Sequence, residues 1–291
     1  MVCVPDLNRG AEQYRKLGFN VQPGGTHPGK GTHNAIAFTD EDYLELLAIR
    51  DPAEERAFNG GKGSWGRNLA GFIAEGGGIR FIIVQSDDLT ADVAAMRRRG
   101  VEVSDVTEGR RKQGSTEFRW KFADLGPKNP LPLFFIQHLT PLEERKRITH
   151  YPSPITEGHP NRVFKLERTY VVERDANATA AQYAKVLGMP QPPIQRGTVI
   201  MADMIVFQLG PHGLGIVQPY APGVAAEALD RRGPGPFQAL YRTHSMGAAA
   251  KWQQEQGLPP FPRGTRNTGE QAMLAPHDHA CGAYIGFVGI E

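Results

Sequence analysis

Apolar and polar residues alternate along this chain in a way that predicts short strands separated by single amphipathic helices. Residues 7–17 carry apolar side chains at helical spacing, with Asp6 suited to cap the first turn and Gly18 suited to end the helix. Each of the other helical patterns also ends at a glycine, which readily adopts the left-handed conformation found after helices. These further helices are expected at 89–99, 177–187 and 247–256.

Short runs with apolar residues, bounded by glycine, proline or charged residues, predict the strands. The expected strands are 2–4, 20–22, 32–38, 42–49, 79–84, 101–103, 116–122, 131–137, 163–172, 198–209, 214–218, 237–241 and 283–288. Strand, helix and further strands recur in this order four times, which predicts an internal repeat of four βαβββ modules in two pairs. The charged, proline-containing segment 141–160 separates the pairs and is expected to be a linker.

The composition removes several classes of function. Lys and Arg number 33 against 31 Asp and Glu, and this near balance argues against a nucleic-acid partner. No apolar run approaches 18 residues, so no membrane span is expected. Cys3 and Cys281 are too few for a disulfide framework or a cysteine-rich zinc site. The first residues show no secretory signal, so we expect a cytoplasmic location.

Several motifs of the first half share one family resemblance. They are Gly-Gly-Thr-His-Pro-Gly-Lys-Gly-Thr-His-Asn-Ala at 24–35, Tyr-Leu-Glu-Leu at 43–46, Asp-Pro at 51–52, Phe-Arg-Trp-Lys-Phe at 118–122 and Pro-Leu-Phe-Phe-Ile at 132–136. Together they resemble the glyoxalase-like branch of the vicinal oxygen chelate superfamily, which includes glyoxalases, bleomycin-resistance proteins and dioxygenases. The second half resembles the superfamily only in the order of its elements.

The resemblance implies an α+β fold with two tandem domains, each built from paired βαβββ modules that form a cupped mixed β-sheet. Residues 1–140 would be the glyoxalase-like domain with the active cup. Residues 161–291 would be a degenerate copy that closes the cup or makes a homodimer face. The superfamily usually holds a divalent metal in the cup, so the resemblance allows a metal in the first domain without assigning one.

Strand alternation predicts which side chains of the first half face the cup, because neighbouring residues point to opposite faces. On strand 42–49, Leu44, Leu46 and Ala48 form the apolar, helix-facing set, which leaves Tyr43, Glu45 and Leu47 for the cup. On strand 32–38, Ile36 and Phe38 are expected in the core, which leaves His33, Ala35 and Ala37 for the cup. Asn34 lies in the same motif and is expected to contact substrate.

The remaining strands of the first half are assigned in the same way. On strand 131–137, Phe134 and Ile136 are expected in the core and Gln137 in the cup. A shift by one residue would instead turn Gln137 toward the helices and His138 into the cup. On strand 116–122, Phe118, Trp120 and Phe122 share one face, and Arg119 and Lys121 share the other. Arg80 lies on a strand that is apolar on both faces.

The metal positions implied by the resemblance are poorly filled. In the first half they fall before Met1, at Glu45, at Arg80 or Phe81, and at Gln137. In the second half they fall at Arg168, Gly215, Gln238 and Gly286, which offer no carboxylate or imidazole, so no tight metal is expected there. Divalent metals require several such ligands. Only Glu45 is a credible ligand, and no metal set is assigned.

Three other signals each have two interpretations. His277, His279 and Cys281 are spaced for one face of a strand and suit a soft metal, or they belong to a turn with incidental histidines. Residues 61–66 fit G-x-G-x-x-G but lack the required preceding buried strand, so a loop is favoured over a nucleotide site. Arg110 and Arg111 are expected in a loop, from which they could reach an anionic substrate.

Two functions remain open. In the first, the protein is a glyoxalase-like lyase or isomerase that acts on a small oxygenated molecule. Glu45 would be the general base or a lone metal ligand, with His33 and Tyr43 assisting catalysis. Substrate would contact Asn34, Arg80, Arg119, Trp120 and Gln137.

In the second, the protein is a metal-free binder of a drug or metabolite, of the bleomycin-resistance type. Glu45 would then be a strand carboxylate, paired with Arg80 across the sheet. A ring-cleaving dioxygenase is a third option, but it would need two histidines and a glutamate that the second half does not offer.

Overall fold

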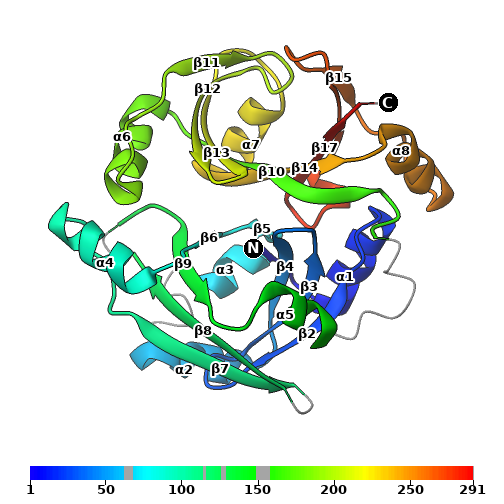
Figure 1. The fold of residues 1–291 in the computed structure, drawn as a ribbon. Coiled ribbons are helices and arrows are strands. Elements are labelled where there is room, and N and C mark those ends of the chain that lie inside the picture. Colours follow the sequence, from blue (N-terminus) through cyan, green and yellow to red (C-terminus); the bar gives the residue numbers. More distant parts are fainter. Residues whose placement is uncertain (62–67, 114–115, 126–128, 149–157, 291) are drawn as a thin grey trace. The chain divides into compact units, whose positions relative to one another are not determined.

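The computed structural model describes residues 1–61, 68–113, 116–125, 129–148 and 158–290 (Figure 1). Its helices are α1 (Leu7–Lys16), α2 (Pro52–Gly61), α3 (Leu69–Ala74), α4 (Leu89–Arg98), α5 (Leu142–Ile148), α6 (Ala176–Leu187), α7 (Val224–Arg232) and α8 (Met246–Glu255). Its strands are β1 (Val2–Cys3), β2 (Gln22–His27), β3 (Thr32–Phe38), β4 (Tyr43–Ile49), β5 (Gly78–Ile79), β6 (Ile82–Gln85), β7 (Thr107–Gln113), β8 (Thr116–Asp124), β9 (Leu133–His138), β10 (Val163–Val172), β11 (Ile194–Gly197), β12 (Ala202–Leu209), β13 (His212–Pro219), β14 (Gly235–Thr243), β15 (Arg263–Thr265), β16 (Gln271–Ala275) and β17 (Tyr284–Gly289).

The fourfold recurrence of strand, helix and three strands is confirmed, with the helices α1, α4, α6 and α8 in the expected places. The side chain of Asp6 caps α1 by accepting the Arg9 N–H, and Asp88 caps α4 by accepting the Ala91 N–H. The expected strand at 101–103 is wrong, because only an isolated bridge joins Val103 to Leu125. None of the described helices is long and apolar enough to cross a membrane.

The described chain forms two compact units, and each draws on both halves of the sequence. The first unit comprises Met1–Arg80, Thr149–Thr169 and Phe237–Glu291, and the second comprises Phe81–Ile148 and Tyr170–Pro236. Helix α5 occupies part of the segment expected as a linker. The expected division of the sequence into domains 1–140 and 161–291 stays a prediction.

The first unit contains two mixed sets of strands, in the hydrogen-bonded orders β2-β3-β4-β1-β5 and β10-β14-β17-β16-β15. Helix α1 packs on β3 and β4, and α8 packs on β17 (Figure 1). The helix-facing side chains of both sets share one core, in which the Phe19 and Tyr241 rings meet edge to face at 5.0 Å. The Tyr14 hydroxyl also donates to the Ala280 carbonyl at 3.1 Å. The first and last modules of the chain are therefore joined by burial of apolar surface.

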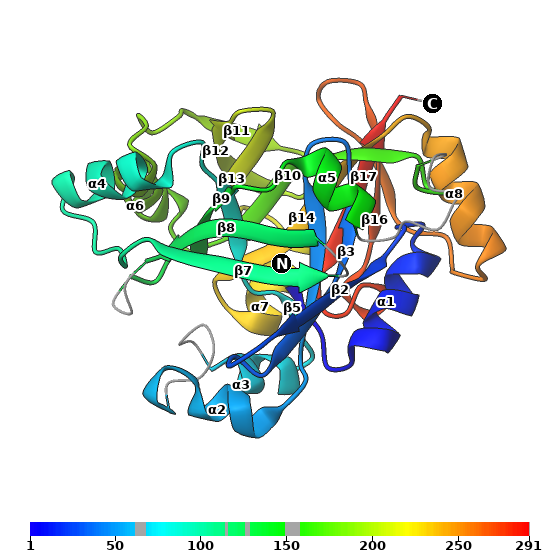
Figure 2. The ribbon, with the colours of Figure 1, turned by 60° about the horizontal axis from the view of Figure 1, so that its bottom comes forward.

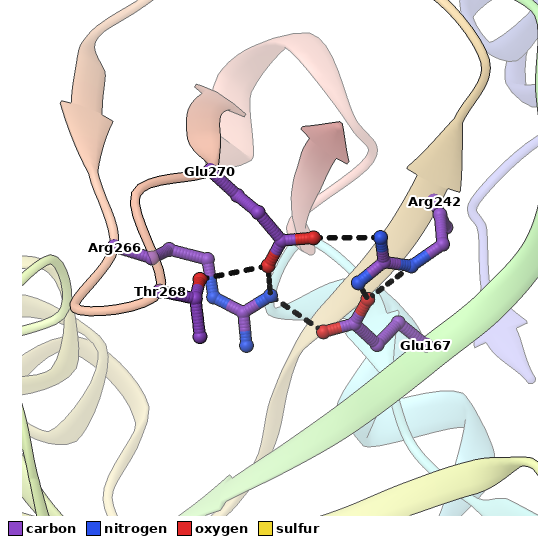
Figure 3. A network of polar contacts seen from close by, with 5 residues as sticks. All are labelled: Glu167, Arg242, Arg266, Thr268 and Glu270. Atoms are coloured by element: carbon purple, nitrogen blue, oxygen red, sulfur yellow. Dashed lines mark hydrogen bonds and ion pairs between the residues drawn. The ribbon is translucent and has the colours of Figure 1, made fainter. Parts of the chain in front are cut away.

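An ion-pair network joins β10, β14 and the β15–β16 turn in the first unit (Figure 3). Arg242 on β14 bonds to Glu167 on β10, and its Nη1 donates to Glu270 Oε1 at 2.7 Å. Arg266 Nη1 donates to Glu167 Oε1 at 2.6 Å and to Glu270 Oε2 at 2.9 Å, and the Thr268 hydroxyl also bonds to Glu270. Burial raises the pKa of Glu270, but these donors outweigh it and the pKa is lowered. Two arginines and two glutamates thus neutralise each other, which a partly buried cluster requires.

The second unit contains the strand orders β6-β9-β8-β7 and β11-β12-β13-β10. Its core lies between these strands and the helices α4 and α6, and includes Phe135, Tyr183 and Phe207. The Arg99 guanidinium at the end of α4 donates to the carbonyls of Lys185 and Val186, both at 2.8 Å. The last carbonyl groups of a helix have no hydrogen-bond partner within the helix, and Arg99 supplies donors to two of them at the end of α6.

His159 makes the stability of the first unit depend on pH. Its side chain is 4% exposed, and its Nδ1 accepts the Asn20 N–H at 2.9 Å. Burial lowers its pKa to about 4, against the opposing effects of the Phe38 backbone and the Asp40 charge. Because the unfolded chain binds this proton more tightly, the stabilisation is complete above about pH 6.5 and is lost as the pH falls toward 4.

We predict that His159→Gln removes this part of the pH dependence. Between pH 7.5 and 5 the unfolding free energy of the wild type should fall by about 2 kcal/mol more than that of the variant. Denaturant unfolding at several pH values measures the difference, and His212→Gln, which replaces a partly exposed histidine of β13, is the control. Parallel curves for wild type and His159→Gln would contradict the assignment.

Candidate functional site

The register of β3 and β4 defines one polar face of the first unit. Ile36 lies opposite Glu45, and Asn34 lies opposite Leu47. Cross-strand partners share a face. We call the side that carries these four residues and Tyr43 the Glu45 face. The expected assignment of β4 is confirmed, since Leu44, Leu46 and Ala48 of the other face lie in the core with α1.

The expected assignment of β3 is wrong. His33 lies opposite Ala48, and Ala35 lies opposite Leu46, so His33 is on the helix-facing side and not beside Glu45. Burial and the Arg50 charge lower the pKa of His33, while Asp6, the cap of α1, acts in the opposite direction. Strand β3 carries apolar residues on both faces, so alternation alone does not indicate which face meets the helix.

Glu45 is held by a buried hydrogen bond from Asn34. The Asn34 Nδ2 donates to Glu45 Oε1 at 2.7 Å, and both side chains are 7% exposed. The Gly25 N–H donates to Asn34 Oδ1 at 2.8 Å, which fixes the orientation of the amide. A charge-assisted bond from a fixed donor holds the carboxylate in one direction. Asn34, expected to contact substrate, therefore orients Glu45.

The two glycines of the first motif make this arrangement possible. The strand expected at 20–22 instead runs from Gln22 to His27 as β2, and its pairing with β3 shifts between Pro23 and Thr26. A Cβ on Gly24 would lie 2.1 Å from Asn34 Oδ1 and 2.8 Å from the Asn34 carbonyl oxygen. The β-bulge thus lets the backbone approach the amide closely, which only glycine permits.

Apolar and aromatic side chains share this face with the carboxylate. Tyr43 is partly exposed, and its ring lies 5.8 Å from that of Phe38. Toward the other end of β4, Leu47 and Cys3 pack under Leu69 of α3. Glu45 therefore shares its face with apolar and aromatic side chains, accepts a bond from a fixed amide, and interacts with the charge of the Met1 amino group.

Arg80 lies at the end of the first unit, near α3. Its guanidinium carbon is 4.8 Å from the centroid of the Phe72 ring. Burial lowers the pKa of the guanidinium, against the opposing effects of Cys3 and Glu75. The cation is thus held by an aromatic ring of α3, and its expected contact with substrate stays a prediction.

In the second unit the structure reverses the expected faces of β9. Gln137 Nε2 donates to the Asp87 carbonyl at 2.6 Å, and its Oε1 accepts the Leu89 N–H at 3.3 Å, so it supports the start of α4. Phe135 lies in the core, and His138 lies opposite Trp120 on the other face. The one-residue alternative is therefore correct, and Gln137 does not face the same side as Trp120.

The pairing of β7, β8 and β9 also separates Trp120 from Arg119. Trp120 lies opposite Gly109 and His138, whereas Arg119 lies opposite Arg110 on the reverse face. Arg119 is largely exposed and lies 3.8 Å from Glu108. The basic residues Arg110 and Arg111, expected in a loop, belong to strand β7.

The described donors do not form a set for a divalent metal. Among the residues that the structure describes, no three His, Cys, Asp or Glu side chains are grouped. Glu45 is bound to an amide, and the His277 to His279 segment is a short 3-10 helix, not a strand. The Cys281 thiol donates to Gln13 Oε1 at 2.8 Å, and burial raises its pKa to about 11. The G-x-G-x-x-G motif lies almost wholly outside the described residues.

The role of Gly24 is the main feature that sequence reasoning missed, whereas His138 was predicted on its observed face only as the alternative to Gln137. Burial, together with the Arg145 charge, lowers the pKa of His138 to about 3, so its imidazole is neutral near pH 7. A usable signal existed in the paired polar residues Gln137 and His138 at the end of an apolar strand. The hydrogen bonds of Gln137 at the start of α4 decide that Gln137, and not His138, turns toward the helices.

Comparison with known proteins agrees with this fold. The family described as "Glyoxalase-like domain" matches residues 1–187. The chain belongs to this family, and its fold is that of the vicinal oxygen chelate superfamily. No curated protein matches.

Solved structures resemble the chain at low sequence identity. A hypothetical protein from Staphylococcus aureus is 14% identical over 98% of this chain and 95% of its own, with a TM-score of 0.67. A mutant of 4-hydroxymandelate synthase from Streptomyces coelicolor is 14% identical over 100% and 92%, with a TM-score of 0.65. Methylmalonyl-CoA epimerase from Mycobacterium tuberculosis covers 45% of this chain and 90% of its own at 20% identity, with a TM-score of 0.39. The first two likenesses establish the shared fold.

We predict that Gly24→Ala disrupts the Asn34–Glu45 contact. The added Cβ meets the amide and the backbone of Asn34, so the unfolding free energy should fall by about 1–3 kcal/mol. Gly247→Ala is the matched control, because a Cβ there has only the Ser245 hydroxyl nearby, at 3.7 Å. The control should be neutral or slightly stabilising in helix α8. Equal stability of Gly24→Ala and wild type in denaturant titration would rule out the close packing.

Proposed function

We propose that this protein is a glyoxalase-like lyase or isomerase in which Glu45 removes a proton next to a carbonyl group. The observation that carries the proposal is the buried Glu45 carboxylate, which the Asn34 amide orients and which shares its face with Ile36, Phe38 and Leu47. A positioned carboxylate of this kind is suited to general base catalysis on a bound carbonyl compound. The substrate class is a small oxygenated molecule.

The proposed step balances without any further reactant. Glu45 accepts the proton of a C–H bond, and the electron pair of that bond moves toward the carbonyl oxygen to give an enolate. An isomerase returns the proton to a neighbouring carbon, whereas a lyase expels a leaving group with the electron pair. The Tyr43 hydroxyl, two residues away on the same face of β4, is the proposed donor to the enolate oxygen. We give His33 no part in this step, because it lies on the opposite face.

The superfamily implies a metal that the described residues do not fit, so no step is assigned to one. Glu45 as a lone ligand would leave the other positions of a divalent ion without protein donors. The chain's own residues supply the base, its orientation and the apolar surroundings.

We predict that Glu45→Gln lowers the rate of proton abstraction about 10²- to 10⁴-fold, since the shape is kept but the basicity is lost. The measurement is exchange of the C–H next to the carbonyl in D₂O, followed by proton NMR. The probes are dihydroxyacetone, hydroxyacetone and 2-oxobutanoate. Glu41→Gln, which changes an exposed carboxylate of the β3–β4 turn, is the control and should exchange at the wild-type rate.

Two outcomes would count against this function. An unchanged exchange rate in Glu45→Gln removes Glu45 as the base. No exchange of any probe by the wild type rejects proton abstraction for this class of carbonyl compound.

A binding protein is the second candidate function, and the apolar character of the Glu45 face supports it. Ile36, Phe38 and Leu47 share this face with the Glu45 carboxylate, which suits capture of an apolar ligand that carries a hydrogen-bond donor or a positive charge. In that case wild type and Glu45→Gln would differ in affinity for such a ligand, and neither would promote exchange.

A further inference from the structure

Strands β7, β8 and β9 of the second unit carry a row of aromatic and cationic side chains on one face. Gly109, Trp120 and His138 lie opposite one another across the three strands. In the next row on the same face, Arg111 lies opposite Phe118. We call this set the Trp120 face. Figure 2 shows β7 and β8 as a long antiparallel pair.

The two faces of these strands differ in what covers them. On the reverse face, Ala123 and Phe135 lie in the core with α4. On the Trp120 face, the side chains of Trp120, His138 and Arg111 are all partly exposed. Partly exposed aromatic groups beside a cation are typical of ligand-binding surfaces, because core aromatics are normally buried.

Trp120 and Arg111 are held in defined positions. A Cβ on Gly109 would lie 2.3 Å from atoms of the Trp120 indole, so the indole lies directly across β7. The guanidinium carbon of Arg111 is 5.1 Å from the centroid of the Phe118 ring. A flat ring and a planar cation are thus presented side by side on one surface. An arginine at this position is suited to binding a carboxylate, because its planar guanidinium can donate two parallel hydrogen bonds to the two carboxylate oxygens.

The charges of the Trp120 face favour an anion. Arg111 is on the face, and the Arg145 charge acts on His138. Glu108 and Glu117 lie opposite Lys121 and Lys112 on the reverse face. The carboxylate on the Trp120 face is Asp124, which is four residues from Trp120 along β8 and therefore about 13 Å away.

We propose that the Trp120 face binds a small planar carboxylate, with its ring or conjugated system against Trp120 and its carboxylate on the Arg111 guanidinium, which the buried Phe118 ring supports. His138 offers a neutral imidazole beside this position as a hydrogen-bonding partner. Every residue of this proposed site belongs to the second unit, and none of them takes part in the proposed step at Glu45. The proposal goes beyond the proton abstraction proposed for Glu45, because it names planar carboxylates as a class of ligand.

Binding of benzoate to the full chain tests this site, with Trp120 as the reporter. The other two tryptophans, Trp65 and Trp252, are replaced by Phe, so that fluorescence reports on Trp120 alone. Benzoate should quench this fluorescence in a saturable way, with a dissociation constant near 1 mM or below, the range open to so small a ligand. Benzyl alcohol, which lacks the charge, should bind about 10-fold or more weakly.

Three variants in the reporter background separate this site from general effects. Arg111→Gln should weaken benzoate binding about 10- to 100-fold, and Arg111→Lys should weaken it less because the charge is kept. Arg110→Gln, on the reverse face, should bind as the reporter protein does. Gly109→Ala displaces the indole and should reduce the quenching without any change of charge.

Several results would overturn the proposal. These are the absence of saturable quenching up to about 20 mM benzoate, equal binding of benzyl alcohol, or equal losses in Arg110→Gln and Arg111→Gln. Circular dichroism of each variant confirms that it is folded. Loss of benzoate binding in Arg111→Gln with normal proton exchange would leave the Glu45 proposal unaffected. Loss of proton exchange in Glu45→Gln with normal benzoate binding would leave the Trp120-face proposal unaffected.

Discussion

The antiparallel pairing that sets Ile36 opposite Glu45 is the constraint on which the candidate site depends. Because side chains alternate between the two faces of a strand, this register places Asn34, Ile36 and Glu45 on one face. The same register sends Leu44 and Leu46 into the core with α1, so burial of that apolar set stabilises the arrangement. A shift by one residue would place Glu45 against the helix and turn Leu44 and Leu46 away from the core that they share with α1. The position of the carboxylate is therefore fixed by the core behind it.

Glycine completes this arrangement from the neighbouring strand. The bulge in β2 brings Gly24 and Gly25 to the Asn34 amide, where Gly25 supplies the N–H and Gly24 supplies the space. The amide therefore has one orientation, and its NH₂ group faces Glu45. Part of the glycine-containing motif at 24–35 is thus a strand whose backbone orients the amide that binds the carboxylate.

The sequence predicted the repeated modules and their helices well, since caps such as Asp6 and Asp88 and the terminal glycines are local signals. It also predicted the faces of β4, where the apolar residues alternate clearly. It failed on β3 and β9, because both strands carry apolar residues on each face and the choice is made by distant partners. Gln137 turns toward α4 to support the start of that helix, which leaves His138 on the opposite side. The meeting of Phe19 with Tyr241 in one core joins residues too far apart in sequence for any local pattern to indicate.

A double-mutant cycle on Asn34 and Glu45 tests most directly whether the fixed amide holds the carboxylate. The unfolding free energies of Asn34→Ala, Glu45→Ala and the double variant give the coupling between the two side chains. A buried bond to a charged group predicts a coupling of about 1–3 kcal/mol. The parallel cycle on His33 and Glu45, whose side chains lie on opposite faces, should give less than about 0.5 kcal/mol. A negligible Asn34–Glu45 coupling, or an equally large His33–Glu45 coupling, would contradict this account of the site.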